Sequence, residues 1–216
     1  MQSQFPSEML DRIQRTRVVS VLVVDQVQSA VPLARALLAG GIDIMELTLR
    51  TPVAIECLKE IRKEVPEMLA GVGTILTPEQ VDQVVEAGAL FGVAPGLNRR
   101  VIQRAQQSGL PFAPGVMTPS DMEAAIELGC RELKFFPAEP SGGLKTLNSM
   151  KAPYLHLGVK FIPLGGVNLA NMTSYLANGD VLAVGGSWIA PPELVDGEKW
   201  DTISSNAAEA CRIANS

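Results

Sequence analysis

The chain has 216 residues, of which 47% are hydrophobic and 19% charged, so it is long and apolar enough to bury one full core. Its formal net charge of −5 argues against a nucleic-acid binder, because such proteins carry a basic surface. Three widely spaced cysteines and a single histidine, His156, argue against a disulfide framework, a Cys/His metal site and a Ser-His-Asp hydrolase.

The first segment, MQSQFPSEMLDRIQRTR, is polar and contains acidic residues. It lacks the apolar centre of a secretion signal, so we expect a cytoplasmic protein with reduced thiols. Residues 6–16 are expected to form a leading helix. The apolar run that follows, VVSVLVV, is too short to cross a bilayer.

Short apolar runs typical of buried strands recur through the rest of the chain. They are expected at 18–24, 42–49, 68–75, 90–95, 111–116, 132–137, 160–166 and 181–187. Most are separated by stretches with helical periodicity, such as 52–64, and a last helix is expected over 200–214. The pairs Thr51-Pro52, Thr77-Pro78 and Thr118-Pro119 each predict a capped helix start.

Repeated strand–helix units predict parallel strands with right-handed crossovers. Eight such units favour an α/β protein, a (β/α)8 TIM barrel that forms a single domain over residues 1–216 with an extra N-terminal helix. A doubly wound open sheet is the second interpretation. It is disfavoured because the first strand is followed by DQVQSAVP rather than by a glycine-rich phosphate loop.

Charged residues alternate along the strand expected at 42–49. With a period of two, Ile44, Glu46, Thr48 and Arg50 share one face. Met45, Leu47 and Leu49 form the other, an apolar face that should pack on helices. Glu46 is therefore expected inside the barrel and Arg50 at its C-terminal mouth, where the active sites of this fold lie. The structural alternative is an ion pair between Glu46 and Arg50.

The strand expected at 132–137 reads ELKFFP and places Glu132, Lys134 and Phe136 on the inner face. A lysine in an apolar strand loses solvation of its charge, so Lys134 is a candidate amine nucleophile for a carbonyl carbon. The alternative is a buried salt bridge between Lys134 and Glu46. Both can hold, because this chemistry needs a base beside the nucleophile.

Small and polar residues end three other strands. Thr74 follows GVG and could bond a substrate oxygen, although a threonine there is more often a helix cap. Gly165-Gly166 and Gly185-Gly186, the latter before Ser187, end the seventh and eighth strands. These are the strands whose loops usually bind phosphate in a TIM barrel, through backbone N–H groups and a helix N-terminus expected near Asn168. Trp188 is interpreted as a packing residue.

These residues lie in motifs that resemble the 2-keto-3-deoxy-6-phosphogluconate (KDPG) and 4-hydroxy-2-oxoglutarate (KHG) aldolase family. The matching segments, in order between about residues 18 and 190, are GGIDIMELTLRTP, GVGTILTPEQ, VAPGLN, ELKFFPAE, PLGGV and VGGSW. The resemblance implies a homotrimer of (β/α)8 barrels that needs no cofactor. The residues themselves predict no metal site, because no CxxC or HxxxH spacing occurs.

The resemblance also implies roles for the site residues. Lys134 would form a Schiff base and Glu46 would be the general acid/base. Arg50 and Thr74 would hold the carboxylate of the pyruvate half. The phosphate and the rest of the substrate would contact the remaining candidates, which are Phe136, Gly165, Gly166, Gly186 and Ser187. Leu164 departs from the family, which often has threonine before this Gly-Gly pair.

The expected function is a lyase, a class I aldolase that cleaves KDPG to pyruvate and glyceraldehyde 3-phosphate, with KHG as a second substrate. The expected partner is this small molecule, with no nucleic acid and no membrane. The C4 epimer of KDPG, the galactonate-derived analogue, is the alternative substrate. A sugar-phosphate isomerase, which forms no imine, and a non-catalytic sugar-phosphate binding barrel are the alternatives outside aldolase chemistry.

Overall fold

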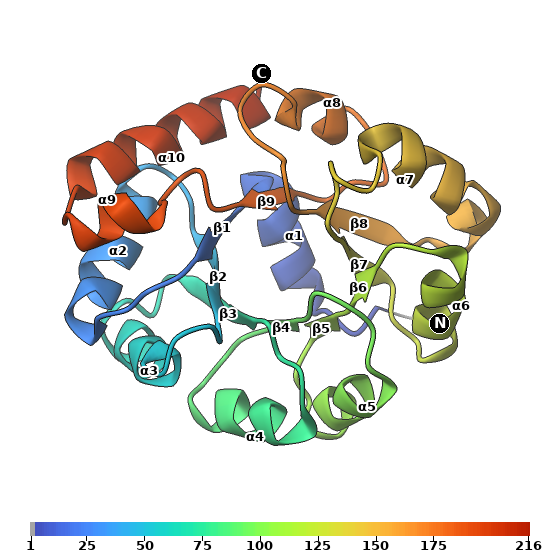
Figure 1. Cartoon of the computed structure of the whole chain (residues 1–216), viewed down its shortest axis with the longest axis horizontal. Coiled ribbons are helices and arrows are strands. Elements are labelled where there is room, and N and C mark those ends of the chain that lie inside the picture. Colours follow the sequence, from blue (N-terminus) through green and yellow to red (C-terminus); the bar gives the residue numbers. More distant parts are fainter. Residues whose placement is uncertain (1–2) are drawn as a thin grey trace.

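The computed structural model describes residues 3–216, an α/β fold in which parallel strands curl around a common centre, with α2–α10 outside them and α1 seen within the ring of strands (Figure 1). The strands are β1 (Val18–Leu22), β2 (Ile44–Thr48), β3 (Leu69–Gly73), β4 (Gly92–Val93), β5 (Phe112–Ala113), β6 (Gly115–Val116), β7 (Glu132–Phe135), β8 (Lys160–Pro163) and β9 (Val184–Gly186). The α-helices are α1 (Ser7–Thr16), α2 (Val27–Ala39), α3 (Ala54–Glu64), α4 (Pro78–Glu86), α5 (Arg99–Gln107), α6 (Pro119–Glu127), α7 (Gly143–Lys151), α8 (Met172–Leu176), α9 (Pro192–Asp196) and α10 (Trp200–Ala214), and Ala152–Leu157 form a 3₁₀ helix.

The strands form two parallel sheets, one of six strands in the order β5-β4-β3-β2-β1-β9 and one of three in the order β6-β7-β8. The single strand expected at 111–116 is divided into β5 and β6, because Pro114 between them has no N–H to donate to a ladder. The chain itself therefore carries one sheet into the other. On the opposite side, the N–H of Leu182 donates to the carbonyl of Phe161, which brings the segment before β9 against β8.

The predicted alternation of strand faces is confirmed. Met45 and Leu133 belong to the large outer cluster, which packs the strands on the helices. Val21 and Ile44 belong to a smaller inner cluster between the strands. Glu46 and Lys134 lie on the inner face of their strands, because they alternate with the outward residues.

The predicted helix starts are partly correct. Thr77 and Thr118 each form a capping box at the start of α4 and α6. The expected cap at Thr51 is wrong: α3 begins at Ala54, and the Thr51 hydroxyl instead donates to the carbonyl of Val24 at 2.7 Å. The helix expected near Asn168 begins later, at Met172.

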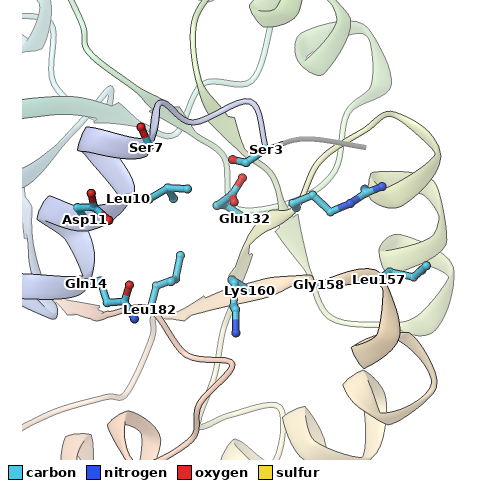
Figure 2. A pocket seen from close by; sticks show the side chains of 11 residues that line it. Ser3, Ser7, Leu10, Asp11, Gln14, Glu132, Leu157, Gly158, Lys160 and Leu182 are labelled. Carbon is cyan, nitrogen blue, oxygen red and sulfur yellow. The ribbon is translucent and has the colours of Figure 1, made fainter.

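Helix α1 precedes β1 and therefore lies at the N-terminal ends of the strands. It is fixed there by Arg12, whose Nε donates to the Asp43 carboxylate at 2.7 Å. A cavity of about 420 Å³ lies between α1 and the first residues of β7 and β8, Glu132 and Lys160 (Figure 2). No helix within residues 3–216 is long and apolar enough to cross a membrane.

Candidate functional site

A cavity of about 590 Å³ lies at the C-terminal ends of the strands, the opposite end from α1. The candidate residues from the five strands named above meet in it: Glu46, Arg50, Thr74, Lys134, Phe136, Gly165, Gly166, Gly186 and Ser187. The strand ends supply the charged and hydroxyl groups, and the loops after β8 and β9 supply the glycines. Candidate residues up to 141 positions apart in the sequence, Glu46 and Ser187, thus line one space.

The centre of the site is an ion pair between Lys134 and Glu46. Lys134 Nζ lies 2.8 Å and 3.1 Å from the two oxygens of the Glu46 carboxylate, and the two residues are only 6% and 2% exposed. The ring of Phe136 lies 5.5 Å from the same amine. A Cβ atom at Gly73 would clash with Glu46 Oε1, so glycine at this position makes room for the carboxylate.

Arg50 does not pair with Glu46 in the described residues, so the structural alternative for these two residues is wrong. Its Nε instead donates to the Thr48 hydroxyl at 3.1 Å, and this hydroxyl donates to the carbonyl of Leu22 at 2.8 Å. Arg50 thus lies at the mouth of the cavity with its remaining N–H groups available for an anion.

Thr74 follows β3 and has a φ of 62°, in the left-handed region. A β-branched residue rarely adopts this conformation, which costs about 1–3 kcal/mol and is retained mainly where function requires it. Since Thr74 lines the cavity, its strained backbone belongs to the site rather than to an ordinary turn.

The Gly165–Gly166 turn has its carbonyls occupied and N–H groups free. Both glycines have left-handed φ values, 90° and 84°. The Gly165 carbonyl accepts from the N–H of Glu139 at 2.9 Å, and the Gly166 carbonyl accepts from the side-chain amides of Asn168 and Asn171 at 3.2 Å and 3.1 Å. Among residues 3–216, the N–H groups of Gly166 and Val167 have no acceptor. Such a turn is suited to an anion.

Several residues that line the cavity were not predicted as site residues. Trp188 packs against the outer core and also lines the cavity, and a Cβ atom at Gly186 would clash with its ring. The sequence pointed to Trp188 only through its position directly after Gly185-Gly186-Ser187. Leu164, 4% exposed, lines the wall between Lys134 and the glycine turn. The others are Val21, Thr48, Pro95, Val167, Asn168 and Pro191. Thr48 had a signal from its strand face, Asn168 from the expected helix start, and Pro95 and Val167 from the VAPGLN and PLGGV segments.

The buried cysteines are poor nucleophiles, and the described residues offer no metal site. Burial raises the pKa of Cys57 to about 11 and that of Cys130 to about 12, so both thiols stay protonated and weakly nucleophilic at neutral pH. No group of three or more His, Cys, Asp and Glu side chains in the described part of the chain is arranged to hold a metal ion.

The chain is similar to proteins of a known family. The model of the KDPG and KHG aldolase family matches residues 9–206. The KHG/KDPG aldolase of Escherichia coli K12 is 42% identical over 193 residues, which are 89% of this chain and 90% of that protein.

Two solved structures share the fold closely. KDPG aldolase from Legionella pneumophila, with pyruvate captured at low pH as a covalent carbinolamine intermediate, has a TM-score of 0.88 and 39% identity, covering 92% of this chain and 96% of that one. The Zymomonas mobilis ZM4 KDPG aldolase with 3-phosphoglycerate has a TM-score of 0.86 and 39% identity, covering 95% and 96%.

Proposed function

The chain belongs to the KDPG and KHG aldolase family, and from this premise we propose that it is a class I aldolase that cleaves KDPG to pyruvate and glyceraldehyde 3-phosphate. The observation that carries the proposal is the buried contact between Lys134 Nζ and the Glu46 carboxylate inside the cavity. It joins an amine nucleophile to a base, which is the minimum for Schiff-base chemistry.

In the proposed reaction, Glu46 accepts a proton from Lys134, and the neutral amine attacks the C2 ketone to form a carbinolamine. Glu46 returns a proton to the hydroxyl, which leaves as water and gives an iminium ion. The C4 hydroxyl then gives its proton to the Glu46 carboxylate, the C3–C4 bond breaks, and its electrons pass into the iminium as the aldehyde leaves. The resulting enamine is protonated at C3 and hydrolysed to pyruvate and free Lys134.

The two anionic ends of the substrate, its carboxylate and its phosphate, are assigned to two different groups of residues. Arg50 and Thr74 would hold the carboxylate next to C2, because they lie at the mouth on the β2–β3 side. The Gly165–Gly166 turn, with Gly186 and Ser187, would hold the phosphate through backbone N–H groups. Phe136 would border the chain between them. The captured carbinolamine and the bound 3-phosphoglycerate of the two solved relatives support a site that takes both halves of the substrate.

We also propose that residues 1–216 form one domain and that the curled strands complete a (β/α)8 barrel with α1 as the extra helix. The continuous segment that holds β5 and β6 supports closure on one side. Bridges from Phe161 to Val181 and from Leu164 to Gly185 support it on the other.

The first test is borohydride trapping with pyruvate, followed by peptide mass spectrometry. We expect a reduced pyruvyl adduct on the peptide that contains Lys134 in the wild type and none in Lys134→Arg, which keeps the charge but lacks the nucleophile. A folded wild type that binds pyruvate without an adduct would contradict the aldolase mechanism and favour an isomerase or a binding protein.

Glu46→Gln tests the second catalytic role. Loss of general acid–base catalysis typically lowers turnover by about 10²–10⁴-fold. We expect kcat for KDPG cleavage to fall within this range, while slow trapping on Lys134 remains measurable. Wild-type turnover in this variant would exclude Glu46 as the acid/base. The same assay with KHG and with the C4 epimer of KDPG decides the preferred substrate, for which Leu164 lines the relevant wall.

A further inference from the structure

We propose that Glu139 and Tyr175 are positioning residues that fix the Gly165–Gly166 turn from behind and thereby set the affinity for the phosphate end of the substrate. Neither residue lines the cavity. Glu139 lies in the loop after β7, which carries Lys134, and Tyr175 lies in α8, which follows the turn. The inference rests on the proposed function, because it takes this turn as the phosphate site.

Glu139 touches both glycines of the turn. Its backbone N–H donates to the Gly165 carbonyl at 2.9 Å, and the preceding N–H, that of Ala138, donates to the Leu164 carbonyl at 2.7 Å. A Cβ atom added at Gly166 would lie only 2.6 Å from Cβ of Glu139, so the stem of this side chain lies directly against the turn. The position of Glu139 therefore determines where the turn lies.

Tyr175 fixes the other end of the Glu139 side chain. The tyrosine is 1% exposed, and its hydroxyl donates a hydrogen bond to Oε1 of Glu139. Burial, followed by the neighbouring carboxylate, raises the pKa of Tyr175, so the hydroxyl stays protonated and remains a donor. Glu139 is otherwise exposed, and without this bond its carboxylate would be free to reorient.

The pair therefore connects the two segments that flank the turn. On the α8 side, Asn168 and Asn171 hold the Gly166 carbonyl, while on the β7 side Glu139 holds the Gly165 carbonyl. This arrangement turns both carbonyls to protein donors and leaves N–H groups for an anion. It also holds the negative charge of Glu139 to Tyr175, which prevents the carboxylate from approaching a bound phosphate and repelling it.

Tyr175→Phe in the full chain tests the proposal. A hydrogen bond to a charged group is lost, and we expect KM for KDPG to rise roughly ten-fold with kcat within about two-fold of wild type. Borohydride trapping with pyruvate, which has no phosphate, should keep its wild-type dependence on pyruvate concentration. A parallel loss in both assays, or an unchanged KM for KDPG, would overturn the proposal.

Two changes at exposed Glu139 keep the test decisive if the buried Tyr175 variant does not fold. Glu139→Gln retains an oxygen that accepts from Tyr175, so its KM for KDPG should stay near wild type. Glu139→Ala removes the bond and should raise KM as Tyr175→Phe does, and the double variant should be no worse than either single one. Equal KM values for Glu139→Gln and Glu139→Ala would contradict the positioning role. If the wild type itself neither traps pyruvate nor cleaves KDPG, the proposed function fails instead.

Discussion

At the scale of single residues, the site concentrates groups that are unfavourable elsewhere in a protein. Lys134 and Glu46 are charged residues in an otherwise apolar interior, and Thr74 has a backbone conformation that favours glycine. Each lies in the cavity, where the proposed chemistry uses it. Replacing the strained Thr74 is therefore expected to improve stability at the expense of activity, whereas replacing only one of Lys134 and Glu46 would leave a buried unpaired charge and destabilise the fold.

Thr74→Gly tests this trade-off. Glycine adopts the φ of 62° without strain, although it also gains entropy in the unfolded chain, so we expect a net stabilisation of about 1 kcal/mol in thermal unfolding. Loss of the hydroxyl should lower kcat/KM for KDPG roughly ten-fold. Thr74→Ser keeps the hydroxyl and should retain most of the activity. A less stable Thr74→Gly variant with unchanged activity would contradict the role of this residue.

At the scale of elements, β7 passes from one end of the fold to the other and carries a different group at each depth. Glu132 begins the strand beside the cavity under α1 (Figure 2). Lys134 lies in the centre, and Phe136 follows at the mouth. Burial raises the pKa of Glu132, with weaker opposing effects from Ser3 and Arg131. The strand that carries the proposed nucleophile Lys134 therefore also carries Glu132, a buried carboxylate that takes no part in the proposed reaction.

Glu132→Gln should increase stability at neutral pH. Because the folded pKa of Glu132 is raised, the folded state binds its proton more tightly than the unfolded state, and stability is lost as pH rises through the folded pKa. We expect a Tm a few degrees above wild type at pH 7.5, and a difference that disappears as pH falls toward about 4, the ordinary pKa of glutamate. Trapping on Lys134 should be unaffected.

Glu86→Gln, at an exposed position near the end of α4, is the matched control and should leave Tm unchanged at each pH. A Glu132→Gln variant that is less stable than wild type at neutral pH would show that the carboxylate of Glu132 is favourably paired rather than desolvated.

At the scale of the whole molecule, the resemblance to the family predicts an assembly of several chains. The homotrimer implied by the resemblance stays a prediction, and sedimentation equilibrium over a range of concentrations tests it. We expect a species with three times the mass of one chain. The exposed large apolar side chains that such a contact could cover are Leu76 (49%), Met117 (44%), Leu155 (44%) and Leu157 (38%). A concentration-independent monomer would contradict the trimer.

The local patterns of the sequence were sufficient for most of the elements and for the direction of the key side chains, but not for the break between β5 and β6 or the start of α8. The two-residue period of a strand depends only on backbone geometry, so the inward face of Glu46 and Lys134 could be predicted without knowing the partner strands. The Thr-Pro starts at Thr77 and Thr118 were equally local. Thr51 failed as a cap because its hydroxyl bonds to Val24, a residue 27 positions away, and such a contact has no local signal.

The sequence by itself therefore determined the strand–helix order, the family and the residue types of the site. Tertiary structure alone decided the contact of Lys134 with Glu46, 88 positions apart, the strained φ of Thr74, and the bond from Tyr175 to Glu139. The physical reason is that periodicity and capping arise from neighbours along the chain. Distances between strands, the free N–H groups of a turn and the support behind it arise only when the sheet curls and brings distant segments together.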